Sequence, residues 1–204
     1  MSLSIRLLSY NIHKGFSPNN QRFVLNEMRL AIRTVNADLV FLQEVLGHHS
    51  QHAKKFQDWP RLPQFEFLAD TIWSHYAYGK NAVYDEGHHG NAILSKYPFA
   101  SWENIDISTN RFEKRGILHG VIDILPLQAK VHVICLHLNL LESGRLMQIR
   151  SLIERIQKAI PNDAPLIIAG DFNDWTGNVG TLLKNNLGLV EVFEATHGRP
   201  ARTY

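Results

Sequence analysis

The chain contains the stretch Leu166-Ile167-Ile168-Ala169-Gly170-Asp171-Phe172-Asn173, in which four apolar residues run directly into a glycine and polar side chains. A short apolar run that ends at turn-forming residues is typical of a buried β-strand. The same arrangement occurs three more times, over residues 5–11, 39–44 and 131–139. We therefore expect four buried strands, each with polar side chains where its apolar run ends.

Two segments between these strands have helical periodicity. Apolar side chains recur at spacings of three and four over residues 21–36 and 142–160, which predicts two amphipathic helices, and Pro161 ends the second. The middle of the chain alternates apolar and polar residues, as half-buried strands do. These predicted strands cover residues 76–80, 92–95 and 116–125. Together the elements predict an α/β layered sandwich.

Composition limits the class of protein. The 204 residues are 45% hydrophobic and 20% charged, a globular make-up that excludes disorder, collagen-like repeats and coiled coil and predicts one domain over residues 1–204. The net charge of +2 neither requires nor excludes a polyanionic partner. A single cysteine excludes an internal disulfide. No apolar stretch approaches the roughly 18 residues of a spanning helix, and we recognise no export signal, so we expect a cytoplasmic protein without a membrane segment.

The polar residues at the strand ends form a chemically coherent set. Ligands favour the crevice outside the carboxyl ends of strands in open α/β sheets, so these residues are expected to converge in one cleft. Carboxylate and amide oxygens suit Mg²⁺, and a histidine beside them supplies a proton donor or a charge partner for a phosphoryl oxygen. The set is Asn11, Glu44, His137, Asp171 and Asn173. Each residue alone has a plainer explanation, as a turn former or a buried histidine; the combination favours attack of water on a phosphate ester.

Six short motifs follow one another along nearly the whole chain. They are Tyr10-Asn11-Ile12-His13, Phe41-Leu42-Gln43-Glu44, Gly90-Asn91-Ala92-Ile93-Leu94-Ser95-Lys96, Arg115-Gly116, Leu136-His137-Leu138-Asn139 and Gly170-Asp171-Phe172-Asn173. In this order they resemble the endonuclease/exonuclease/phosphatase family. The resemblance implies a four-layer α/β/β/α sandwich, in which two mixed β-sheets pack face to face between helices. It also implies Mg²⁺-dependent phosphoester hydrolysis, with Mn²⁺ as an alternative cation.

The resemblance also implies a role for each matching residue. Glu44 and Asn11 match the family's metal site, and His137 matches a histidine that contacts the scissile phosphate. Asp171 and Asn173 match the pair that positions or activates the attacking water. Three further residues are expected to contact the substrate phosphate: Arg115, Asn91 and Asn139. A surface ion pair explains Arg115 equally well, and a turn explains Asn91.

The chain departs from the family pattern at its C-terminal end. The family normally closes with a further strand and an aspartate–histidine pair, whereas this sequence ends at Thr196-His197-Gly198-Arg199-Pro200-Ala201-Arg202-Thr203-Tyr204. We expect a domain that is truncated there. The alternative to an enzyme is therefore a phosphate- and metal-binding module without turnover. The substrate stays open among a phospholipid head-group, nucleic acid and a small phosphorylated metabolite, and no partner protein is predicted.

Histidines occur in two further groups, His48-His49-x-x-His52 and His88-His89. Structural zinc needs three or four ligands on defined elements. These histidines lie among serine, glutamine and glycine, far from the single cysteine, so we expect loop residues that line the mouth of the cleft rather than a zinc site.

Overall fold

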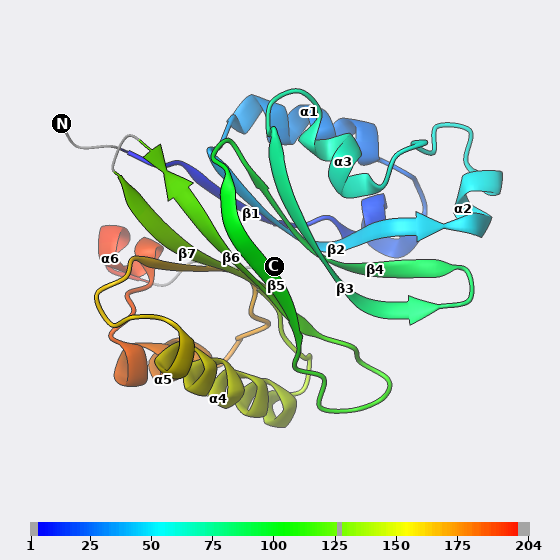
Figure 1. Ribbon diagram of the computed structural model, residues 1–204. Coiled ribbons are helices and arrows are strands. Elements are labelled where there is room, and N and C mark those ends of the chain that lie inside the picture. Colours follow the sequence, from blue (N-terminus) through cyan, green and yellow to red (C-terminus); the bar gives the residue numbers. More distant parts are fainter. Residues whose placement is uncertain (1–3, 126–127, 200–204) are drawn as a thin grey trace.

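The computed structural model describes residues 4–125 and 128–199, and it contains two four-stranded sheets packed face to face (Figure 1). The first sheet has the order β1 (Leu7–Asn11), β2 (Leu39–His49), β4 (Gly87–Ser95) and β3 (His75–Tyr84). The second has the order β5 (Phe99–Asp106), β6 (Gly116–Ile124), β7 (Ala129–His137) and β8 (Leu166–Asp171). Each sheet is mixed, because β1 pairs with β2 and β7 with β8 in parallel while the other pairs are antiparallel.

Helices cover the outer face of each sheet, which completes the four layers (Figure 1). The first sheet is covered by α1 (Leu25–Val35) and α3 (Gln64–Ala69), and the second by α4 (Glu142–Ala159) and α5 (Asn178–Leu187). The short elements are two 3₁₀ turns (His13–Gly15 and Pro18–Asn20), α2 (Ser50–Lys55) and α6 (Val192–His197). The expected α/β/β/α sandwich is confirmed.

Three apolar layers hold the sandwich together. Leu25, Met28 and Ile32 of α1 pack with Leu68 and Trp73 against the first sheet, where the Trp73 indole donates to the Ala37 carbonyl. Between the sheets lie Phe41, Ile93, Leu118, Val133 and Cys135. The apolar face of α4 packs with α5 against the second sheet through Ile149, Leu152, Ile156, Val179 and Leu183. Burial in these layers fixes which face of each strand points inward.

The helices expected from periodicity are present, with shorter bounds. α1 begins at Leu25, because residues 13–20 form the two tight turns and Phe16 then bridges Phe23 before the helix. It ends where Asn36 takes a left-handed conformation and its N–H bonds to the Ile32 carbonyl, a common helix terminus. None of the helices within residues 4–125 and 128–199 combines the length and the apolar character needed to cross a bilayer.

Two expectations about β2 and the histidines are wrong. β2 does not end near Glu44 but continues to His49, and it pairs with β4 through His48 opposite His88. The two histidine pairs therefore lie in strands rather than loops, and His52 lies in α2. Pattern alone hides this extension because it projects beyond the core, where polar side chains are tolerated on both faces.

Candidate active site

Three residues of the predicted site lie together: Asn11 at the end of β1, Asp171 at the end of β8, and Glu44 within β2. β1 and β2 are parallel, as are β7 and β8, and Asn11 at the end of β1 reaches across to the second sheet. The Asn11 side-chain nitrogen donates to Glu44 Oε1 and to Asp171 Oδ2, each at 3.1 Å. One amide thus joins two carboxylates that are separated by most of the sequence. We refer to Asn11, Glu44 and Asp171 as the carboxylate cluster.

A bulge in β2 aims Glu44 at this cluster. The register between β2 and β4 shifts between Leu42 and Val45, and Glu44 has a φ of 55°, a left-handed conformation that is unusual for a residue with a side chain. Bulges and strained backbone are typical of functional sites, because they re-aim one side chain without moving the rest of the strand. Glu44 is therefore presented to the strand ends by local strain that the surrounding sheet supports.

Glu44 is held as an anion. Burial raises the pKa of its carboxyl, but the hydrogen bond from Asn11 and the charges of Lys14 and His137 outweigh burial and lower the pKa below its ordinary value. Lys14 Nζ lies 3.8 Å from Glu44 Oε2, and His13 Nδ1 lies 3.6 Å from the same oxygen. The Glu44 side chain is 18% exposed, so its charge is only partly screened by water.

The backbone before Asp171 has room for glycine only. Gly170 has a φ of +151°, and a Cβ built on it would lie 2.0 Å from the Leu136 carbonyl oxygen of the neighbouring strand. This close approach of β8 to β7 sets Asp171 directly opposite His137. Asn173 then turns back with a φ of 48°, and its N–H donates to Asp171 Oδ1 at 3.1 Å. The Gly-Asp-Phe-Asn motif thus orients one carboxylate from both sides.

His137 is buried beside the cluster. Its Nε2 lies 3.8 Å from Asp171 Oδ2, and its side chain is 8% exposed. Burial lowers the pKa of His137, the nearby Arg115 charge lowers it further, and Asp171 and Glu44 oppose that shift without overcoming it. The imidazole is therefore neutral at neutral pH, able to donate or accept one hydrogen bond at each nitrogen.

The three expected phosphate contacts differ in their surroundings. Arg115 lies close enough to His137 and His89 for its charge to lower the pKa of both. It forms an ion pair with Glu113 at 2.7 Å, and its buried Nε has no partner in the described residues. Asn91 and Asn139 are buried, at 1% and 2% exposure, and donate to the Gly116 carbonyl and to Thr109 Oγ1. Burial leaves the two asparagines little surface for contact with a substrate, and it favours a role in positioning their neighbours. Their contact with the substrate phosphate stays an untested prediction.

Two residues beside the carboxylate cluster were not predicted from the sequence, and a third, His89, was expected only at the mouth of the cleft. His13 and Lys14 follow Asn11 after one residue, Ile12, and the short tight turn with left-handed φ values at both residues directs them to Glu44. His89 of β4 is also near: burial and then the Lys14 charge lower its pKa to about 4, although Glu44 opposes the shift. Position after a strand end could have identified His13 and Lys14. His89 depends on the unexpected β2–β4 extension.

The donor chemistry of the cluster fits a magnesium-type ion. Mg²⁺ is commonly held by one or two carboxylates, with water and substrate oxygen completing its shell, so a full protein cage is not required. Glu44 and Asp171 supply hard carboxylate oxygens of this kind, while Asn11 presents its side-chain nitrogen to them and its Oδ1 accepts from the His13 N–H at 3.0 Å. A site with three or more histidine, cysteine or acidic ligands, as zinc prefers, is not found among residues 4–125 and 128–199.

Comparisons with known proteins agree with this geometry. A family model described as the endonuclease/exonuclease/phosphatase family matches residues 8–204. Protein YbhP of Escherichia coli (strain K12) is 50% identical over 202 residues, which cover 98% of this chain and 79% of that protein.

Two solved structures share the fold. The endonuclease/exonuclease/phosphatase from Beutenbergia cavernae DSM 12333 has a TM-score of 0.73 at 19% identity; the match covers 97% of this chain but only 60% of that protein's length. D. rerio TDP2 complexed with single strand DNA product has a TM-score of 0.64 at 22% identity and covers 96% of this chain and 71% of that one. The chain therefore belongs to the endonuclease/exonuclease/phosphatase family, which includes metal-dependent phosphoesterases and nucleases.

Proposed function

We propose that the protein hydrolyses a phosphoester, with Mg²⁺ or Mn²⁺ held at the carboxylate cluster. The observation that carries the proposal is the shared hydrogen bonding of Glu44 and Asp171 to the one Asn11 amide. Two carboxylates are costly to place together in a partly buried cleft, because like charges repel and lose hydration. A divalent cation relieves that repulsion, which gives the arrangement a chemical purpose.

Glu44 and Asn11 are the residues that would hold the cation, as the family resemblance implies. When bound, a divalent cation of this kind polarises a phosphoryl oxygen and lowers the pKa of bound water. The lowered pKa of Glu44 suits this task, since a permanently ionised carboxylate keeps its affinity for a cation at neutral pH. Lys14, next to Glu44, adds a positive charge for an incoming phosphate.

Asp171, Asn173 and His137 are the residues assigned to the reacting groups. Asp171 is held by hydrogen bonds from Asn11 and from the Asn173 N–H, so its carboxylate has a fixed orientation from which to accept a proton from water. The neutral His137 imidazole beside it is able to donate a hydrogen bond to a phosphoryl oxygen. Arg115, already oriented by Glu113, would supply charge to the same phosphate.

We propose no single substrate class for the reaction. Among the described residues, Lys14 and Arg115 are placed near the carboxylate cluster, whereas a polynucleotide is usually gripped by basic side chains at several phosphates. We therefore keep a phospholipid head-group, nucleic acid and a small phosphorylated metabolite as candidates, with a phosphodiester or a phosphomonoester as the bond cleaved. The cytoplasmic location expected from the sequence stays a prediction, which cell fractionation would test.

The test is hydrolysis of bis-p-nitrophenyl phosphate with Mg²⁺ or Mn²⁺. Glu44→Gln and Asp171→Asn keep side-chain size but remove one charge each, and we expect each to lower the rate by about 10²-fold or more. Glu154→Gln is the matched control, since Glu154 is exposed on α4 away from the cluster. Metal-dependent activity that survives both cluster variants contradicts the proposal. Metal binding without any turnover in the wild type favours the non-catalytic module instead.

A further inference from the structure

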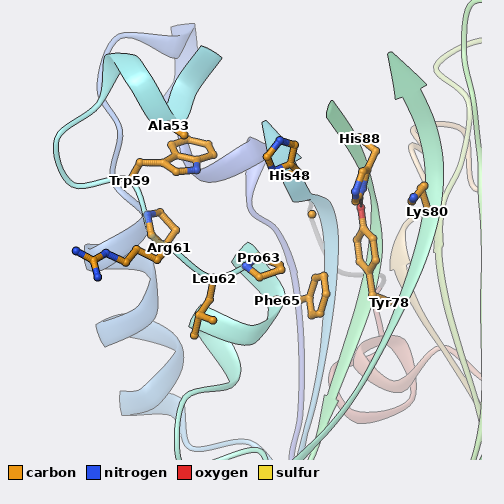
Figure 2. Close-up of a pocket in the computed structure, with 12 residues that line it drawn as sticks. His48, Ala53, Trp59, Arg61, Leu62, Pro63, Phe65, Tyr78, Lys80 and His88 are labelled. Carbon is orange, nitrogen blue, oxygen red and sulfur yellow. Dashed lines mark hydrogen bonds between the residues drawn. The ribbon is translucent and has the colours of Figure 1, made fainter. Parts of the chain in front are cut away.

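A second cavity lies on the other side of the β2–β4 extension, and Figure 2 shows the residues that line it. Its volume is about 480 Å³, within the range of about 300–1,000 Å³ that is usual for small-molecule sites. One wall comes from the sheet, with Gly47 and His48 of β2, Tyr78 and Lys80 of β3 and His88 of β4. The facing wall comes from Ala53 of α2, the loop 59–63 and Phe65 of α3.

The charge of this cavity is of one sign. Among the 12 lining residues are two histidines, one lysine and one arginine, and none is acidic. His48 lies opposite His88 in the β2–β4 register, and Lys80 is on the adjacent strand. Within the described part of the chain, none of these three residues forms an ion pair with a carboxylate. Lys80 is therefore an uncompensated positive charge beside two imidazole rings that can form hydrogen bonds, a combination that suits an anion.

Flat aromatic rings supply the rest of the walls. Phe65 and Tyr78 are stacked with ring centroids 4.5 Å apart, and Trp59 at the opposite side is stacked on Phe23 at 4.8 Å. The Tyr78 hydroxyl lies 3.0 Å from His88 Nδ1, which fixes the imidazole ring. Burial raises the pKa of Tyr78, so the phenol keeps its proton. Because these rings are already held in place, they lose little conformational freedom when a planar ligand packs against them.

The cavity is separate from the carboxylate cluster. The two sites share no residue, and Phe65 and Tyr78 pack with the apolar layer beneath α1 and α3, on the outer face of the first sheet. Alternation along a strand explains the division, since adjacent residues point to opposite faces. His88 lines the cavity, whereas its neighbour His89 lies within range of the Glu44 charge.

We propose that this cavity binds a small ligand in which a planar aromatic ring carries a phosphate group, of the kind found in a nucleoside monophosphate. The ring lies against Trp59, Phe65 and Tyr78, and the phosphate faces His48, Lys80 and His88. Figure 2 shows the Arg61 guanidinium directed away from the two histidines, so the phosphate is assigned to the sheet wall rather than to Arg61. Burial lowers the pKa of His88, with the nearby Lys80 charge adding to the effect, so Lys80 supplies the positive charge. His88 donates from Nε2 in the tautomer in which its Nδ1 accepts the Tyr78 hydroxyl proton.

The experiment is isothermal titration calorimetry with adenosine 5′-monophosphate in the presence of a chelator, so that binding is measured without metal-dependent turnover. We expect one site per chain, and we expect adenosine alone and inorganic phosphate alone to bind at least about tenfold more weakly. Lys80→Gln should weaken binding by about tenfold, whereas Lys130→Gln, an exposed lysine of β7, should leave it unchanged. Ala53→Trp adds bulk to the exposed facing wall and should also weaken binding without disturbing the core.

Two results would overturn the inference. One is the absence of binding at millimolar nucleotide in a protein whose thermal unfolding shows it to be folded. The other is binding that Arg115→Ala abolishes while Lys80→Gln and Ala53→Trp leave it intact, because the phosphate would then lie beside the carboxylate cluster, where Arg115 is the nearby cation. Retained nucleotide binding in Arg115→Ala supports the cavity even if the protein proves to have no hydrolytic activity, so the two proposals fail separately.

Discussion

Replacing Asn11 by alanine tests the bond network at the centre of the site. The substitution removes two hydrogen bonds to carboxylates, each of 3.1 Å. A hydrogen bond to a charged group contributes about 1.5–3 kcal/mol when buried. Here the acceptor side chains are 18% and 31% exposed, so water replaces part of each bond. We expect Asn11→Ala to lower the free energy of unfolding at neutral pH by about 2 kcal/mol, measured by urea denaturation.

The same experiment at acid pH separates charge from packing. The folded-state pKa of Glu44 lies below its ordinary value of 4.5, so the stability it contributes is complete above that value and is lost as pH falls through the folded pKa. The difference between wild type and Asn11→Ala should therefore shrink as the pH falls below 4.5 and through the folded-state pKa of Glu44. Asn186→Ala on α5, where the amide donates to the Leu182 carbonyl, is the control and should show no such change. An equal deficit at neutral and acid pH would refute the reasoning.

Three further outcomes are expected. Gly170→Ala should lower the free energy of unfolding by about 3 kcal/mol or more in urea denaturation, because its Cβ would overlap the Leu136 carbonyl; a stability near that of wild type contradicts the backbone geometry. Arg115→Ala should raise KM for bis-p-nitrophenyl phosphate by about tenfold, and an unchanged KM would remove Arg115 from the phosphate site. His119 Nε2 lies 3.0 Å from His132 Nδ1, and burial lowers the pKa of both histidines. The stability that the two neutral rings contribute to the fold is complete above pH 6.5, the ordinary histidine value, and is lost as the pH falls below it. Wild type should therefore lose more stability between neutral pH and about pH 5 than His119→Gln, as measured by urea denaturation, and parallel losses would contradict this.

Much of the fold could be predicted because the apolar residues that become buried recur in regular patterns along the chain. The apolar runs before Asn11, His137 and Asp171 became β1, β7 and β8, and the two periodic segments became α1 and α4. Elements with weak periodicity were not expected: β5, α2, α3, α5 and α6. Short helices and edge strands bury little apolar surface, so tertiary packing rather than local pattern decides whether they form.

The sequence predicted which residues form the candidate site better than it predicted their backbone geometry and burial. Asn11 and Asp171 lie together because β1 and β8 end at the same place, whereas Glu44 joins them from within β2. The bulge at Glu44 was not expected, because neighbouring strands rather than the residues themselves impose its left-handed backbone. Likewise, the burial of Asn91 and Asn139 depends on partners from distant segments, Gly116 and Thr109.

Cation binding at the carboxylate cluster is the claim on which the proposed activity rests. Titration of the protein with Mn²⁺, with free Mn²⁺ followed by electron paramagnetic resonance, measures it directly and without assuming a substrate. We predict that the wild type and Glu154→Gln bind Mn²⁺ with equal affinity. Glu44→Gln should bind it at least about tenfold more weakly, since a carboxylate ligand is lost. Equal Mn²⁺ affinity in all three proteins, or no binding in any, would contradict the account.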